Sequence, residues 1–279
     1  MNKFFIEKLY SGLSQKIEIK KLLINKKSKF QKIEVFDSSF YGRVLALDGI
    51  VQLTEKDESA YSEMLVHPAI QSLKNPPNNI LIVGGGDGAV AEEVLKYKFI
   101  KNIDLVDIDK DVVDLSKKYF KKINNNSLNN KKIKFFYEDA VEFIKNTSNI
   151  YDVIIADRPD PVGAGKSLYK LNFYKNIRKI MSIDSLVIFQ SGVPFLQKQE
   201  LKGVMKDVKR FFKYSGCILT VVPSYIGGYM TLVWASNNIN LLKEKKHLAQ
   251  YKISTQYYNK EVLTASFALP NFIKSICEN

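Results

Sequence analysis

The chain has 279 residues, of which 46% are hydrophobic, and it carries a formal net charge of +13. That length allows one large α/β domain or two unequal ones, and no run approaches the ~20 apolar residues that span a bilayer. Two cysteines are too few for a disulfide framework, and two widely separated histidines do not suggest a zinc site. We therefore expect a cytoplasmic protein with no membrane segment and no metal.

The basic charge is spread along the chain and not clustered. Only four of the 42 basic residues are arginines, and the lysines occur in scattered pairs beside asparagines. No stretch interleaves aromatic and basic residues as single-strand binders do. We expect a solvated surface and no nucleic-acid partner. The alternative, a nucleic-acid-binding module, predicts salt-sensitive binding without turnover.

The first part of the chain is typical of a small antiparallel β unit. Its predicted strands cover residues 17–24, 30–36, 41–47 and 50–54. The dipeptide Asp48-Gly49 is a strong hairpin signal between the last two of them. A helix is predicted over 61–73. We therefore expect an N-terminal antiparallel β domain over residues 1–60 and a second domain over residues 61–279.

A glycine-rich turn comes after the short apolar run 80–83, which suits a buried strand. Gly84, Gly86 and Ala89 fit the G-x-G-x-x-G/A spacing of a nucleotide-binding turn. Glycine leaves room for a ligand near the backbone, and free N–H groups at the start of the next helix face that ligand. The match alone is a weak signal, and its value depends on the pattern of the chain after residue 97.

Beyond this turn, strands and helices alternate. Further strands are predicted over 103–107, 132–137, 151–156, 185–190, 217–222 and 229–235, and helices over 89–97, 110–120, 140–145 and 197–212. The polar run 121–132 is expected to be a loop whose asparagines are low-complexity filler. This alternation predicts a mostly parallel sheet with helices on both faces, which binds ligands at the carboxyl ends of its strands.

Acidic residues stand at the ends of successive strands of this predicted sheet. They are Asp87, Asp107, Asp139, and Asp157 with Asp160. Asp107 stands about 20 residues beyond Asp87, a spacing expected for an acid that binds ribose hydroxyls. Five acids at one edge of a basic protein predict a negative pocket and therefore a cationic ligand.

Several motifs in the same order resemble those of the spermidine synthases, which are polyamine aminopropyltransferases. They lie at residues 47–58, 61–64 (Tyr-Ser-Glu-Met), 84–88 (Gly-Gly-Gly-Asp-Gly), 157–163 (Asp-Arg-Pro-Asp-Pro-Val-Gly), 223–228 and 265–270. The resemblance implies a methyltransferase-like Rossmann fold preceded by a small antiparallel β domain, in a homodimer or homotetramer. It also implies transfer of the aminopropyl group of decarboxylated S-adenosylmethionine to putrescine, which gives spermidine and 5′-methylthioadenosine without cofactor or metal.

This chemistry suits a pocket of carboxylates. The donor carries a sulfonium and an ammonium, and putrescine carries two ammonium groups, so negative charge stabilises both. The sulfonium already activates the electrophilic carbon. The protein has to align the two molecules and remove a proton from the attacking amine, for which a carboxylate within reach is suited.

The resemblance implies a role for each candidate residue. Asp157 would be the general base, with Tyr61 beside the attacking nitrogen. Asp107 would bind the ribose, Asp139 the adenine amino group and Asp87 the donor's ammonium. The full donor set is Gln31, Gly84, Gly86, Asp87, Asp107, Ile108, Asp139 and Ala140, and the acceptor set is Gln52, Asp160, Gln190 and Tyr225.

Two departures from the family pattern bear on these roles. The family commonly has Glu where this chain has Asp107. Arg158 and Pro159 separate the two aspartates where small residues are usual, and we expect Arg158 to point outward. Residues 160–169 are expected to form a flexible lid with hinges at Gly163 and Gly165.

Two alternatives stay open within this class of ligand. The acceptor could be cadaverine, agmatine or spermidine, since cavity depth decides chain length. The reaction could also be N-methyl transfer to putrescine from S-adenosylmethionine. Asp87 discriminates between the two donors, because it would attract an ammonium and repel a methionine carboxylate.

Overall fold

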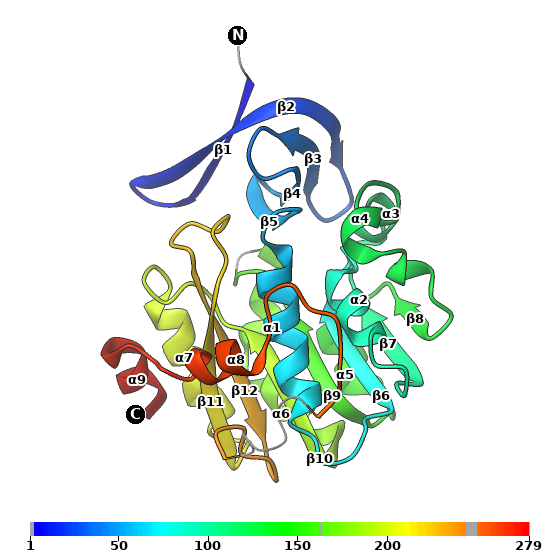
Figure 1. Cartoon of the computed structure of the whole chain (residues 1–279), viewed down its shortest axis with the longest axis vertical. Helices are drawn as coiled ribbons and strands as arrows, with labels where there is room; N and C mark the ends of the chain where they lie inside the picture. Colours follow the sequence, from blue (N-terminus) through cyan, green and yellow to red (C-terminus); the bar gives the residue numbers. More distant parts are fainter. Residues whose placement is uncertain (1–2, 162, 244–249, 279) are drawn as a thin grey trace.

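The computed structural model describes residues 3–161, 163–243 and 250–278. These residues form two β-sheets, with helices packed on the larger one. Figure 1 shows the smaller, N-terminal sheet at the top and the larger sheet below it. The N-terminal sheet is antiparallel with the order β1-β2-β3-β4-β5. Its strands are β1 Lys3–Tyr10, β2 Leu13–Lys27, β3 Lys32–Ser38, β4 Arg43–Leu47 and β5 Ile50–Thr54. The predicted antiparallel unit is confirmed, and β1 is an addition to it.

The larger sheet has seven strands in the order β11-β12-β10-β9-β6-β7-β8. They are β6 Asn79–Gly84, β7 Asn102–Val106, β8 Ile133–Phe136, β9 Tyr151–Asp157, β10 Met181–Gln190, β11 Tyr214–Val221 and β12 Tyr229–Ser236. The neighbouring strands β8, β7, β6, β9 and β10 are parallel to one another. At the other edge, β12 pairs antiparallel with β10, and β11 pairs antiparallel with β12. The order reverses between β6 and β9, where a crevice opens in sheets of this kind. The predicted methyltransferase-like α/β fold is confirmed.

Helices cover both faces of this sheet. They are α1 Glu58–Gln71, α2 Ala89–Leu95, α3 Lys110–Tyr119, α4 Lys121–Asn124, α5 Ala140–Asn146, α6 Leu171–Lys179, α7 Lys198–Val208, α8 Lys260–Ser266 and α9 Asn271–Glu278, with 3-10 helices η1 Ser127–Asn129 and η2 Gly163–Tyr169. The five predicted helices correspond to α1, α2, α3, α5 and α7, with ends shifted by a few residues. Helices α6, α8 and α9 are additions.

Alternate residues of the central strands enter two separate cores. On β6, Ile80 and Ile82 pack with α1, α2 and α8, whereas Leu81 and Val83 pack with α5, α6, α7 and α9. This two-sided burial explains why β6 is an uninterrupted apolar run. Figure 1 shows α1 in front of the sheet and the C-terminal helix α9 at one side of it. The strand ends that carry polar residues are thereby fixed from both faces.

The N-terminal sheet rests on the carboxyl-end side of the larger sheet. Its apolar face, with Ile33, Val35 and Leu45, packs against Val112 of α3 and the buried Phe120. The chain leaves β5 at Thr54 and enters α1 at Glu58. The predicted division at residue 60 falls inside α1, and the division of the chain into domains stays a prediction.

The segment 121–132, expected to be a loop of filler residues, is structured, so that expectation is wrong. It forms α4 and η1. The buried Asn124 amide donates to Asp87 O (3.1 Å) and Ser116 O (3.2 Å), and the Ser127 hydroxyl donates to Gly88 O (2.8 Å). Buried carbonyl groups need hydrogen-bond donors. The segment 121–132 supplies donors to two carbonyls of the glycine turn, those of Asp87 and Gly88.

Glu63 joins the C-terminal part of the chain to α1. This buried carboxylate accepts hydrogen bonds from the backbone N–H groups of Gln256 (2.7 Å), Tyr257 (2.9 Å) and Tyr258 (2.6 Å). Three donors satisfy a charge that would otherwise be costly to bury. Residues far apart in sequence therefore fix the helix that carries Tyr61.

We predict that Asn124→Ala lowers the free energy of unfolding by about 1–3 kcal/mol, because the carbonyls of Asp87 in the glycine turn and Ser116 in α3 lose this donor. Urea unfolding measures the change. The control is Asn129→Ala, the same substitution at an exposed position of the same segment, which is expected to cost less than about 0.5 kcal/mol. Equal losses in the two variants would contradict the assigned role of Asn124.

Candidate active site

A cavity of about 320 Å³ lies at the carboxyl ends of the parallel strands, between the two sheets. All the predicted site residues line it: Gln31, Gln52, Tyr61, Gly84, Gly86, Asp87, Asp107, Ile108, Asp139, Ala140, Asp157, Asp160, Gln190 and Tyr225. The structure thus brings together side chains that the sequence spreads over about 200 positions. Their individual roles stay predictions.

Asp157 is the last residue of β9 and lines the cavity. Its Oδ1 accepts a hydrogen bond of 2.6 Å from the Tyr61 hydroxyl of α1. Gly84, at the end of β6, pairs with Asp157 in the parallel ladder. A Cβ on Gly84 would lie 2.0 Å from Asp157 O, and φ there is +79°, so glycine permits this close approach.

The glycine turn also positions Asp107, at the end of β7. Asp107 Oδ2 accepts from Gly86 N (3.0 Å) and its Oδ1 accepts from Asp109 N (2.8 Å). A Cβ at position 86 would lie 2.5 Å from Asp107 Oδ2. Asp87 Oδ1 accepts from Ala89 N (2.8 Å) at the start of α2. Both carboxylates are therefore held by backbone N–H groups.

Burial raises the pKa of the acids in this cluster, and the charges of neighbouring acids add to the effect for Asp157 and Asp107. Burial, followed by the charge of Asp87, raises the pKa of Asp157 to about 7. Burial raises the pKa of Asp107 to about 6, with the charges of Asp109 and Asp87 adding to the effect. Burial also raises the pKa of Asp87. In the part of the chain that the structure describes, no lysine or arginine forms an ion pair with these three, so the cavity favours cations.

One end of the cavity combines amide and carboxylate groups from both sheets. Gln31 Nε2 donates to Asp109 Oδ2 (3.0 Å), which also accepts from the Ser28 hydroxyl (2.6 Å). Asp139 Oδ1 accepts from Val141 N (2.8 Å) and caps α5. This end is suited to the polar edges of a nucleoside.

The other end is lined by tyrosine, glutamine and carboxylate side chains. The Tyr225 hydroxyl donates to Gln52 O (2.6 Å), and its ring meets that of Tyr61 edge-on at 6.2 Å. Gln190 Nε2 donates to Asp160 Oδ1 (3.4 Å). Gln52 Nε2 donates a hydrogen bond to Ile50 O (3.2 Å). This end is suited to an elongated polar molecule.

The expectation that Arg158 points outward is wrong. Its side chain is only 2% exposed. The guanidinium donates to Gln190 O (3.1 Å), Leu168 O (2.6 Å) and the Tyr174 hydroxyl (3.0 Å). The side chain turns inward because hydrogen-bond acceptors and aromatic rings replace water around the guanidinium. These groups lie at the end of β10, in η2 and in α6.

Sequence reasoning gave no role to several other carboxylates in the cavity wall. Glu58 accepts a short hydrogen bond from the Ser62 hydroxyl, and burial raises its pKa to about 8. Asp57 accepts from the Thr54 hydroxyl (2.5 Å) and Ser224 N (2.6 Å), which joins the β5–α1 corner to the loop carrying Tyr225. Both stand in the motif at 47–58. Asp109, the hydrogen-bond partner of the lining residue Gln31, shows the pattern of a helix cap before α3.

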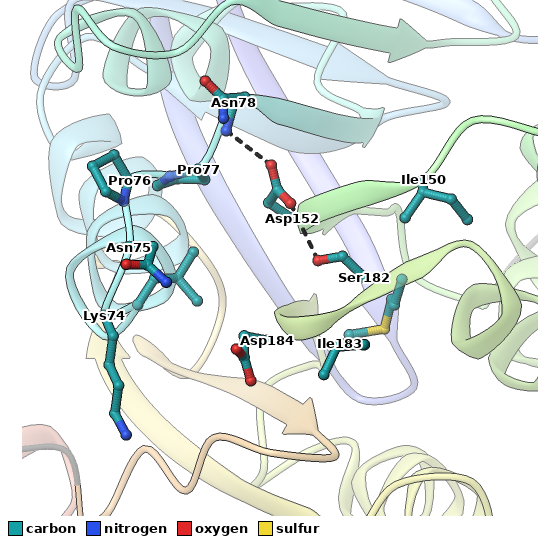
Figure 2. Close-up of a pocket in the computed structure, with 12 residues that line it drawn as sticks. Lys74, Asn75, Pro76, Pro77, Asn78, Ile150, Asp152, Ser182, Ile183 and Asp184 are labelled. Carbon is teal, nitrogen blue, oxygen red and sulfur yellow. Dashed lines mark hydrogen bonds between the residues drawn. The ribbon is translucent and has the colours of Figure 1, made fainter.

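A second hollow, of about 620 Å³, lies at the opposite, amino-terminal ends of the strands. Figure 2 shows Asp152 between Asn78 and Ser182 there. Asp152 Oδ2 accepts from the backbone N–H groups of Asn78 (2.8 Å) and Asn79 (3.0 Å), and its Oδ1 accepts from Ser182 (3.2 Å). No predicted site residue lines this hollow, and its carboxylate is occupied by structural hydrogen bonds.

Two kinds of feature are absent from the described residues. Over residues 3–161, 163–243 and 250–278, no group of three or more His, Cys, Asp and Glu side chains is arranged to hold a metal ion. In the same ranges no helix has the length and apolar character needed to cross a membrane.

Comparisons with known proteins agree with this geometry. A family described as "Spermine/spermidine synthase domain" matches residues 58–246, and one described as "Spermidine synthase tetramerisation domain" matches residues 4–55. The polyamine aminopropyltransferase of Buchnera aphidicola subsp. Schizaphis graminum (strain Sg) is 37% identical over 276 residues, which are 97% of this chain and 96% of the relative. That of Ruegeria sp. (strain TM1040) is 34% identical over 275 residues, 97% and 96% of the two chains.

Solved structures are similar over nearly the whole chain. A spermidine synthase in complex with the transition state analogue AdoDATO has a TM-score of 0.94 at 29% identity, with 99% of this chain and 95% of that chain covered. The spermidine synthase from Thermotoga maritima has a TM-score of 0.91 at 28% identity, with 99% and 94% covered.

We predict that the isolated protein loses stability as the pH rises from about 4 to about 7. A carboxyl group whose pKa in the folded state lies above its unfolded value of 3.8 binds its proton more tightly in the folded state. Proton binding therefore stabilises the fold fully below pH 3.8, and this stabilisation is lost as the pH rises through the folded-state pKa. Asp157→Asn should therefore be more stable than the parent at pH 8, by on the order of 2 kcal/mol, and equal to it near pH 4.

Thermal and urea unfolding at both pH values test this expectation. Asp114→Asn, a change of the same kind on an exposed carboxylate of α3, serves as the control and should show no gain at pH 8. A parent protein whose stability rises steadily from pH 4 to pH 8 would contradict the raised pKa of Asp157.

Proposed function

The chain belongs to the spermidine synthase family of polyamine aminopropyltransferases, and from this premise we propose that it transfers the aminopropyl group of decarboxylated S-adenosylmethionine to putrescine. The products are spermidine and 5′-methylthioadenosine. The observation that carries the proposal is the Asp157 carboxylate, with a pKa of about 7 and a hydrogen bond of 2.6 Å from Tyr61, in a cavity of acids that lies where parallel sheets bind ligands.

The donor is assigned to the end of the cavity that holds Asp107 and Asp139. Asp107 binds the ribose hydroxyls, Asp139 accepts from the adenine amino group, and Gln31 reaches the same end from the N-terminal sheet. Gly84, Gly86, Ile108 and Ala140 line the surface against which the nucleoside rests. Asp87 binds the ammonium of the aminopropyl arm, and its burial among other acids supports a cationic partner.

The acceptor is assigned to the opposite end. Gln52, Asp160, Gln190 and Tyr225 bind the far ammonium and the methylene chain of the diamine, and the near amine lies beside Tyr61 and Asp157. Asp157 takes a proton from this amine, whose nitrogen lone pair then forms a bond to the aminopropyl carbon next to sulfur. The carbon–sulfur bond breaks, its electron pair neutralises the sulfonium, and methylthioadenosine leaves uncharged.

A pKa near 7 is suited to this proton transfer. A carboxylate at its usual pKa of 3.8 is a much weaker base, and Asp157 gains basicity from burial and from Asp87. Tyr61 keeps Asp157 oriented toward α1 through the hydrogen bond to Oδ1. Alignment of the two molecules supplies the remaining rate enhancement, because the sulfonium is already an activated leaving group.

The protein's setting is also part of the proposal. Both cysteines are free thiols, which supports a reducing, cytoplasmic location. No cofactor and no metal take part in the proposed transfer, since the sulfonium carries the activation. The net charge of +13 is assigned to solubility and not to a nucleic-acid partner.

We predict release of methylthioadenosine when the purified protein receives decarboxylated S-adenosylmethionine and putrescine. Mass spectrometry identifies the second product as spermidine. A panel with cadaverine, agmatine and spermidine as acceptors ranks kcat/KM, and putrescine is expected to be first. A higher value for another acceptor would correct the acceptor assignment, and methylputrescine formed from S-adenosylmethionine would replace the reaction class.

For Asp157→Asn we predict a loss in kcat of about 10²–10⁴, with donor affinity within a few-fold of the parent, because the amide keeps the shape and loses the base. In the parent, kcat/KM should rise with pH up to about 7 and then level off as Asp157 becomes ionised. Unchanged turnover in the variant, or a pH profile flat between 5.5 and 8, would remove Asp157 as the base.

We also propose that the chain assembles as a homodimer or homotetramer through its N-terminal sheet. The match of residues 4–55 to a tetramerisation domain supports this, as do the half-exposed apolar side chains Phe4, Ile6 and Leu13 of the β1–β2 hairpin. Ile6→Glu is expected to reduce the mass measured by light scattering. Ile183→Glu, at an exposed position of β10, is the control. Equal masses for both variants would contradict the proposed interface.

A further inference from the structure

Arg158 is a buried cation that stands beside the proposed base. Its side chain is 2% exposed, and Nε donates to Gln190 O at the end of β10. Nη1 donates both to Leu168 O of η2 and to the Tyr174 hydroxyl of α6. One side chain thus joins the ends of β9 and β10, η2 and α6.

Aromatic rings lie close to this charge. The guanidinium carbon lies 3.8 Å from the ring centroid of Tyr169, 5.1 Å from that of Phe189 and 5.5 Å from that of Tyr174. Among the described residues the Arg158 guanidinium forms no ion pair, and its Nη2 has no hydrogen-bond partner. A buried cation without an anion is costly, so the surrounding rings and carbonyls must keep their places for it to remain buried.

Tyr169 carries this constraint to the acceptor end of the cavity. Its ring covers the guanidinium, and its hydroxyl lies 2.8 Å from Gln190 Oε1 and 3.1 Å from Pro159 O, where it can donate to either. Gln190 Nε2 in turn donates to Asp160 Oδ1. The backbone of Gln190 is held by Arg158 directly, and its side chain is held through Tyr169.

We propose that Arg158 is a positioning residue for the acceptor: its planar guanidinium fixes η2 against β10 and so holds Gln190 and Asp160 in the geometry that binds the far end of the amine. The inference rests on the proposed function for its kinetic consequence. It assigns no contact between Arg158 and either substrate. The charge is needed for stacking on Tyr169, and the forked geometry is needed to reach two carbonyls at once.

The test compares Arg158→Met with Arg178→Met, the same change at an exposed arginine of α6. Arg158→Met is expected to raise the KM for the acceptor about tenfold, the effect of one displaced hydrogen bond to a charged group, and to leave the KM for the donor within twofold. Arg178→Met should change neither. Arg158→Lys should behave like Arg158→Met, because an ammonium lacks the fork.

Two further measurements separate positioning from general damage. Tyr169→Phe should raise the acceptor KM, and the double variant Arg158→Met/Tyr169→Phe should be little worse than Arg158→Met alone, since both act through Gln190. Hydrogen exchange in a peptide covering residues 165–174 should be at least about tenfold faster in Arg158→Met than in Arg178→Met.

The outcomes decide the inference whether or not transfer is observed. Unchanged hydrogen exchange in residues 165–174 of Arg158→Met overturns the positioning role of Arg158, and this measurement does not require an active enzyme. A parent protein that transfers no aminopropyl group overturns the proposed function and not the positioning role. In an active parent, donor and acceptor KM values that rise together, or an Arg158→Lys variant with the parental acceptor KM, overturn it. An acceptor-specific rise with faster exchange supports it.

Discussion

Burial of carboxylates that the fold brings together is the constraint on which the site depends. The sheet places β6, β7 and β9 side by side, so Asp87, Asp107 and Asp157 meet at one edge. Separate cores on the two faces of the sheet prevent the strands from moving apart. Backbone N–H groups hold Asp87 and Asp107, whereas Asp157 receives the Tyr61 hydroxyl. Asp157, held by the Tyr61 hydroxyl, has a pKa raised to about 7, and Asp107, held by two backbone N–H groups, has a pKa raised to about 6. Chemically identical side chains therefore differ in basicity within one cavity.

The N-terminal sheet completes the site and does more than cover it. Asp109 shows this, because its carboxylate caps α3 through Asp111 N and also receives Ser28 and Gln31 from the turn before β3. At the other end, Asp57 connects the start of α1 with the loop of Tyr225. Single acids therefore connect the two sheets at both ends of the cavity. The distance between the two ends of the cavity is set by these connections as well as by the larger sheet.

Much of this arrangement is visible in the sequence, because it rests on local patterns. The apolar run before the glycine turn, the hairpin signal at Asp48-Gly49 and the acids after successive strands predicted the sheet and its functional edge. The pattern could not show how Asn124 is used, since one of its two acceptors, Asp87 O, belongs to a turn distant in sequence. Arg158 was misplaced for the same reason: surface exposure is the rule for arginine, and the carbonyls and rings that receive it come from three other elements. Helix α6 did carry a signal, with Phe173, Tyr174 and Ile177 buried on one face.

The hydrogen bonds between Glu63 and residues 256–258 can form only late in the synthesis of the chain. Helix α1 emerges from the ribosome early, yet its buried carboxylate finds its three backbone donors only when almost the whole chain has been made. Until then the helix that carries Tyr61 holds an unsatisfied charge against the sheet. The nascent chain can form its parallel strands in sequence as they appear, but the helix that carries Tyr61 gains these three hydrogen bonds only after residue 258 has been made. An interrupted translation product could therefore contain most of the sheet and still lack this support for α1.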